Sequence, residues 1–73
     1  MVSDEEREAK MLRTIVVSTR AALLKTSGSQ AERVRDRSDE LLADLESLVI
    51  RDGGSETIIA AIDRERRALQ ERE

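Results

Sequence analysis

The sequence predicts an all-α protein: a long antiparallel helical hairpin plus a shorter third helix, assembling as a homodimeric helical bundle. Over most of the chain apolar residues recur every three or four positions, the spacing of an amphipathic helix. The breaks in this pattern fall at the three glycines, and there is no proline. The chain, residues 1–73, is long enough for a single small domain, and it has no aromatic residue, no Cys and no His. The hydrophobic core of a single chain is therefore expected to be small and to lack stabilisation by disulfides or zinc. Self-association is expected to complete this core.

The first helix is expected over residues 3–27. Ser3 and Glu6 form a capping box, in which the serine hydroxyl accepts from an early backbone N–H group and the glutamate bonds back. Gly28 is expected to end this helix, because glycine readily adopts the left-handed conformation found just beyond helix ends. The inner side is expected to carry Leu12, Ile15, Val16, Thr19, Ala22 and Leu23.

A second helix is expected over residues 29–52, between a capping box that starts at Ser29 and the pair Gly53–Gly54. Its apolar stripe runs in steps of three and four, which places the members on one side of the helix. Leu42 and Val49 widen that stripe. It consists of Ala31, Val34, Ser38, Leu41, Leu45 and Leu48. The seam of the bundle is expected at Val34, Leu41, Leu45 and Leu48, with the three leucines at the centre of the dimer.

The third helix is expected over residues 55–72, with Ser55 as its cap and Glu56 in its first turn. Its inner side carries Ile58, Ile59, Ile62 and Leu69. Glu65 and Arg66 fall on that same side. The first two turns are therefore expected to dock and the last two to be solvated.

Charge predicts the register of the hairpin. The connection between the first two helices is short, which favours an antiparallel arrangement. The second half of the first helix carries only basic charges: Arg13, Arg20 and Lys25. Between Ser38 and Ile50 the second helix carries only acidic ones: Asp39, Glu40, Asp44 and Glu46. Folding at the connection should lay one stretch against the other, each exposed pair contributing about 0–1 kcal/mol.

No constellation of residues predicts catalysis. The chain has no His, Cys or Tyr, the commonest general bases, nucleophiles and metal ligands besides carboxylates. Carboxylates one turn apart, such as Asp36, Glu40 and Asp44, are interpreted as a solvated helix face. Residues 52–56 place glycines before a helix, as anion-binding loops do, but without the lysine and strand of a P-loop. We therefore expect no enzymatic activity, no cofactor and no metal.

Nucleic acid and membranes are not expected as partners. The net charge is −3 and the isoelectric point is about 5.0, which argues against binding a polyanion. Two arginine clusters are interleaved with Asp and Glu, and no aromatic side chain is available to stack on bases. These clusters are Arg33, Arg35 and Arg37, and Arg64, Arg66 and Arg67. No apolar run is long enough to span a membrane, the first residues are acidic, and Cys is absent, so a cytoplasmic protein is expected.

One segment carries a family resemblance. Residues 54–62 read GSETIIAAI. This stretch resembles the second helix of ribbon-helix-helix antitoxin-type repressors, which would imply DNA binding. The chain departs from that pattern because it lacks the short basic strand that such repressors place in the DNA major groove.

A second stripe on the first helix is the strongest candidate for function. Arg13, Val17, Arg20 and Leu24 lie at i, i+4, i+7 and i+11, roughly opposite the core side. The third helix or a symmetry mate could cover them, or they could bind a foreign protein, since interfaces mix arginine with apolar residues. The sequence thus predicts a small regulator or inhibitor that binds a larger protein stoichiometrically. The alternatives are a structural oligomerisation element and a DNA-associated regulator.

Overall fold

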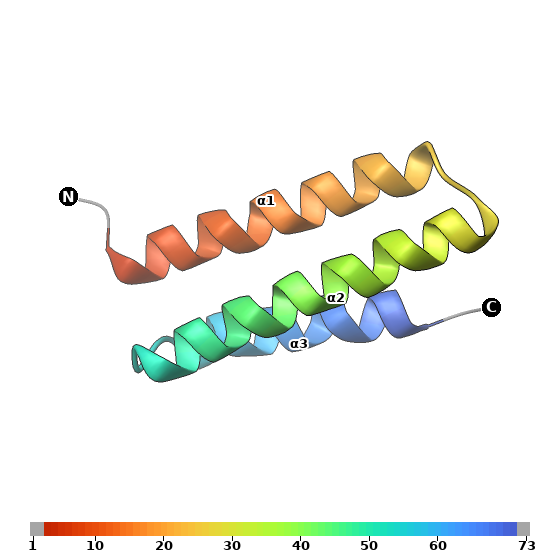
Figure 1. The fold of residues 1–73 in the computed structure, drawn as a ribbon. Helices are drawn as coiled ribbons and strands as arrows, with labels where there is room; N and C mark the ends of the chain where they lie inside the picture. Colours follow the sequence, from red (N-terminus) through yellow and green to blue (C-terminus); the bar gives the residue numbers. More distant parts are fainter. Residues whose placement is uncertain (1–2, 72–73) are drawn as a thin grey trace.

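The three predicted helices form an up-down-up arrangement. The structure, a computed structural model, describes residues 3–71 and contains α1 (Asp4–Leu24), α2 (Gly28–Arg51) and α3 (Glu56–Gln70). The helices α1 and α2 form a long antiparallel hairpin, and α3 runs back along α2 (Figure 1). Residues 3–71 include no strand, so they offer no ribbon for the repressor-like arrangement. The all-α fold class is confirmed.

The Ser3 cap at the start of α1 matches the prediction, although no return bond from the Glu6 side chain occurs among the described residues, and the end of the helix differs. The Ser3 hydroxyl accepts from the backbone N–H of Glu6 at 3.2 Å. The helix ends at Leu24 instead of residue 27. At this end the Lys25 N–H donates to the Ala22 carbonyl at 3.1 Å, a tightened i→i−3 bond, and the Thr26 hydroxyl donates to the same carbonyl at 3.0 Å.

The start of α2 also differs from the prediction. The expected capping box at Ser29 is wrong, because the N-cap is Ser27, whose side chain makes no capping bond. Gly28 is the first residue of α2 and has a φ of +60°. A positive φ at this glycine reverses the chain early, so that Ser29 already lies within the first helical turn.

The turn between α2 and α3 is a Schellman motif, as the glycine pair indicates. Gly53 has a φ of +69°. Its N–H donates to the Ile50 carbonyl at 3.1 Å, and the N–H of Gly54 donates to the Val49 carbonyl at 2.7 Å. Ser55 then caps α3 by accepting from the Thr57 N–H at 3.1 Å. The predicted cap is confirmed.

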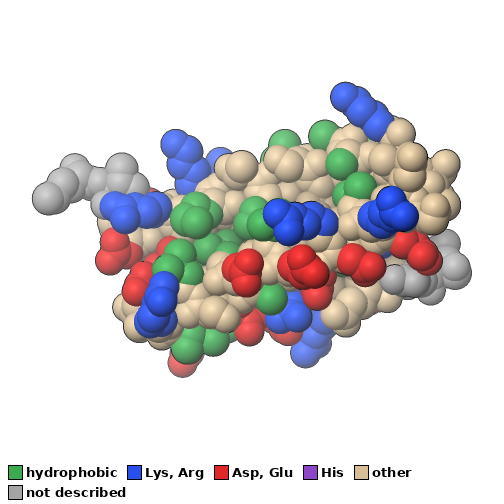
Figure 2. Space-filling model, viewed as in Figure 1, with side chains coloured by type: hydrophobic (Ala, Val, Ile, Leu, Met, Phe, Trp, Pro, Cys, Tyr) green, Lys and Arg blue, Asp and Glu red, His purple; other side chains and the backbone are tan. Residues whose placement is uncertain are grey.

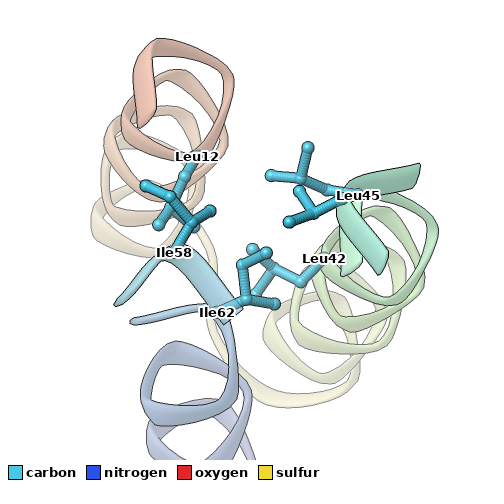
Figure 3. Packing of buried hydrophobic residues seen from close by; sticks show 6 residues of the cluster. Leu12, Leu42, Leu45, Ile58 and Ile62 are labelled. Carbon is cyan, nitrogen blue, oxygen red and sulfur yellow. The ribbon is translucent and has the colours of Figure 1, made fainter. Parts of the chain in front are cut away.

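The core lies where the three helices meet. Leu12 of α1, Leu42 and Leu45 of α2, and Ile58 and Ile62 of α3 point toward one another (Figure 3). Val49 completes this cluster. Helix α2 is the shared partner, because it packs against both other helices.

The buried side of α2 is rotated relative to the predicted stripe. Leu42 and Val49, expected at its margin, are 1% and 0% exposed. Val34 and Leu48 are only partly buried, and Leu41 is exposed. The reason is the position of α3: because α2 packs against α1 and α3 together, its most buried line points between them.

One polar contact joins α1 and α2 inside the protein. The Thr19 hydroxyl donates to the Ile15 carbonyl at 2.7 Å and shares a hydrogen bond of 2.7 Å with the Ser38 hydroxyl. Both side chains are buried. The polar position in the α2 stripe is therefore satisfied within the chain.

Among the described residues, the ion pairs between helices join α2 to α3. Arg66 Nε lies 2.9 Å from Asp39 Oδ1, and Arg66 Nη1 lies 3.7 Å from Glu46 Oε2. Within residues 3–71, Arg13 and Arg20 form no ion pair with the acidic stretch of α2. The predicted charge register is therefore wrong. The second half of α3 is also less solvated than expected, because Arg66 is anchored and Leu69 packs against the core.

The arginine that joins α3 to α2 is strongly held in its charged form. The hydrogen bond to Asp39 raises the pKa of Arg66 above its ordinary value, with smaller contributions from the nearby charges of Asp39, Glu46 and Asp63 against the lowering effect of burial. A raised pKa means that the stabilisation is present below the ordinary arginine range and is lost only as pH rises through the raised value.

The stability of the protein is expected to be nearly constant between about pH 6 and 8, because the chain has no His to titrate there. Arg66 stays charged throughout that range. Stability should fall at acid pH, because the ion pairs that Arg66 makes between α3 and α2 need charged carboxylates. Melting temperatures measured by circular dichroism across the pH range test this. A steep change between pH 6 and 8 would contradict it.

Glu8 is buried without a partner among the described residues. Its side chain lies in α1 and is 4% exposed, and Oε2 has no hydrogen-bond donor within residues 3–71. The same oxygen lies beside Gly54, where an added Cβ would approach it to 2.8 Å. A buried polar atom without a hydrogen bond costs free energy.

Replacement of that carboxylate is expected to stabilise the protein. Glu8→Met keeps an unbranched side chain of similar length and should raise the free energy of unfolding by about 1–3 kcal/mol. Urea denaturation measures this. Glu5→Met is the matched control, because Glu5 is exposed in the first turn of α1; it should lower stability by about 0.3–1 kcal/mol through the helix dipole. Destabilisation by Glu8→Met would show that the carboxylate has a partner after all.

Candidate protein-binding surfaces

The predicted stripe on α1 lies on the surface of the chain. Val17 is 58% exposed and Leu24 is 89% exposed, and Arg13 and Arg20 are exposed as well. Arg20 also lines a small cleft between α1 and α3 of about 190 Å³. Neither α2 nor α3 covers Val17 or Leu24, so the four residues remain available to another molecule.

A second surface lies in the groove between α1 and α2. A hollow of about 490 Å³ between α1 and α2 shares Thr14 and Ile15 with a hollow of about 350 Å³ that is lined by α1 alone. We call these two adjoining hollows together the groove. Its lining comes from α1 and α2 alone within the described residues. The apolar lining residues are Met11, Ile15, Ala22, Val34 and Leu41.

The apolar side chains of this groove are exposed to solvent in the isolated chain. Met11 is 40% exposed and Leu41 is 39% exposed. Figure 2 shows hydrophobic side chains gathered over α1 and α2 on this face, with Lys and Arg side chains beside them. Contiguous apolar surface bordered by charge is typical of interaction sites in small proteins.

The charged residues that line the groove are all basic: Arg7, Lys10, Arg33 and Arg37. A row of Asp and Glu side chains also lies on this face and runs directly beside these basic residues, outside the lining of the groove (Figure 2). Arg37 forms one exposed pair with Glu40 at 3.7 Å, and such pairs contribute little. The charges that line the groove itself are therefore basic, although acidic side chains flank it and the net charge of the chain is negative.

The structure separates the four residues of the predicted seam. Leu45 belongs to the core within the chain, and Leu48 packs against that core. Val34 and Leu41 line the groove. A dimer through the groove would therefore use Val34 and Leu41, while Leu45 has its place inside each chain.

Sequence reasoning placed Ile15, Val34 and Leu41 in the core and so missed the groove as a surface. The signal was present, because the apolar sides of both long helices are wider than one third helix can cover. The spacing of apolar residues does not show from which side α3 packs against the hairpin. That side decides which edge of each apolar stripe stays exposed.

Other features of the molecule point to no chemistry. Among residues 3–71, no three acidic side chains come close enough to hold a metal ion. None of the helices is both long and apolar enough to cross a membrane, judged on those same residues. The groove and the α1 stripe are thus the candidate surfaces.

Comparisons of this chain with protein-family models, with curated proteins and with solved structures give no match.

Proposed function

We propose that the protein is a small non-enzymatic interaction module, a regulator or inhibitor that binds a larger partner protein stoichiometrically. The observation that supports this most is the apolar, basic-bordered groove between α1 and α2. Burying that surface against a partner is favourable, whereas its charged border keeps the free chain in solution. A cytoplasmic location belongs to the same proposal, because the chain has no Cys to be oxidised elsewhere.

The stripe of Arg13, Val17, Arg20 and Leu24 is a second surface within this proposal. Its apolar members are exposed more than those of the groove. They stand on a convex helix surface, however, and the charged residue Arg20 lies within one turn of both. A groove encloses more of a bound side chain than a ridge does, so the groove is the better candidate for the main contact.

Self-association is the second candidate function. The described core holds only seven buried hydrophobic residues, and none of them is aromatic. Domains of this size usually need an additional source of stability, and a homodimer that covers the groove would supply one. In that case the protein acts as an oligomerisation or assembly element.

Two matched variants test the proposal. Leu41→Asp places a charge in the groove, and Val17→Asp places the same charge on the stripe; both positions are exposed, so circular dichroism should show unchanged helicity. Immobilised wild-type protein should capture a defined protein from a lysate of the source cells. We expect Leu41→Asp to lose that protein and Val17→Asp to retain it.

The other outcomes assign the surfaces differently. Loss with Val17→Asp alone would make the stripe the docking surface. Retention by both variants, or no capture by the wild type, would contradict the proposed function. Light scattering at micromolar concentration decides the second candidate: a dimer mass that Leu41→Asp reduces to that of the monomer would support self-association.

A further inference from the structure

We propose that the groove between α1 and α2 accepts an acidic amphipathic helix of another protein. This inference rests on the proposed function, because it names the kind of partner that would use the groove. It follows from three properties of the groove: its length, the apolar character of its floor, and the sign of the charge along its borders.

The floor of the groove has the dimensions of a helix. On α1 the apolar lining extends from Met11 to Ala22, which is about 16 Å at the rise of an α-helix. That length matches about three turns of a bound helix. Two packed helices leave a straight furrow between them, and an amphipathic helix fills such a furrow with apolar residues at i, i+3 or i+4, and i+7.

The borders of the groove select acidic side chains. Arg7 and Lys10 lie in the lining beside Met11, and Arg33 and Arg37 line the part next to Val34. Within residues 3–71, Arg7, Lys10 and Arg33 form no ion pair. A bound helix whose polar flanks carry Asp or Glu would pair with these cations, and the charges would also speed its association.

A second copy of the chain fits this groove less well. In a two-fold dimer the same surface occurs on both subunits, so groove would face groove. The basic residues that line one groove would then approach those of the other, because the acidic row of α2 runs beside the groove and not in its lining (Figure 2). Like charges across an interface disfavour a pairing.

The test uses two labelled synthetic helices of about 18 residues each, with the same leucines on one face. One carries Glu on its polar face and the other carries Lys. Fluorescence anisotropy should show that the acidic helix binds at least about tenfold more tightly than the basic one at low salt, and that this preference shrinks as salt rises.

Charge reversal at the borders provides the decisive variant. The double substitution Arg33→Glu with Arg37→Glu should reverse the preference between the two helices, while circular dichroism stays unchanged because both residues are exposed. Arg64→Glu is the matched control, since Arg64 is exposed on α3 away from the groove. Leu41→Asp should remove binding of the acidic helix.

Equal affinity for the two helices, or no binding of either, would overturn this inference. The proposed function would still stand if the wild type captured a cellular protein that Leu41→Asp loses. A dimer that depends on Leu41 would also overturn the inference, because the groove would then be occupied by a second copy.

Discussion

Leu45→Ala is expected to lower the free energy of unfolding by about 2–5 kcal/mol. Leu45 is 3% exposed and packs in the cluster where all three helices meet (Figure 3). Truncation removes apolar contacts and leaves a cavity whose walls belong to three different helices. A protein of this size has little stability to lose, so the variant should be largely unfolded at moderate urea concentration. Urea denaturation followed by circular dichroism measures the change.

Leu24→Ala is the control for this experiment, because it makes the same chemical change at an exposed residue. We expect its effect to stay within about 0.5 kcal/mol. The measurement also distinguishes the core from a dimer contact. If the loss in Leu45→Ala depended on protein concentration, Leu45 would stabilise an assembly and not the single chain.

Gly54→Ala is expected to destabilise the protein by about 1–3 kcal/mol, because the added methyl group has no room. A Cβ at this position would lie 2.5 Å from Val49 Cγ1, 2.8 Å from Glu8 Oε2 and 2.9 Å from the Val49 carbonyl oxygen. The carbonyl accepts the hydrogen bond from Gly54 that closes α2. The turn must therefore shift, and it carries the start of α3 with it.

Gly28→Ala separates crowding from backbone strain. An added Cβ at Gly28 meets no atom within 4 Å, but the residue has a φ of +60°. Gly28→Ala should therefore lower the free energy of unfolding only through backbone strain, by about 1 kcal/mol. Thermal unfolding of the two variants side by side measures both. If Gly54→Ala cost no more than Gly28→Ala, the close approach of Glu8 and Val49 to the turn would be relieved by small movements.

The elements of the fold could be predicted because their signals are local. The Ser3 and Ser55 caps and the Gly53–Gly54 turn each depend on hydrogen bonds within a few residues. The early end of α1 was missed because its last turn closes with an i→i−3 bond from the Lys25 N–H to the Ala22 carbonyl, and the same sequence can also continue a helix. The exact end of α1 thus depends on which backbone hydrogen bonds form there, and the spacing of apolar residues does not describe that choice.

The candidate surfaces could be predicted only in part. The exposed position of Val17 and Leu24 follows from a helical wheel of α1 alone. The groove does not, because Ile15 and Leu41 belong to stripes that a third helix could have covered from either side. The choice depends on contacts such as Arg66 with Asp39, which join residues far apart in the sequence.

The buried hydroxyl pair of Thr19 and Ser38 has a consequence for the uniqueness of the native state. A hairpin packed by Leu, Ile and Val alone can slide by one helical turn and still bury similar side chains, since these residues interchange with little loss. Each such slide would separate the two hydroxyls. Thr19 would keep its bond to the Ile15 carbonyl, whereas Ser38 would be left buried opposite aliphatic groups without its partner, at a cost of about 1–3 kcal/mol. The pair therefore destabilises misaligned hairpins more than it stabilises the correct one. The pair thus increases the energy difference between the native state and misaligned compact states, which a core without aromatic residues would leave small.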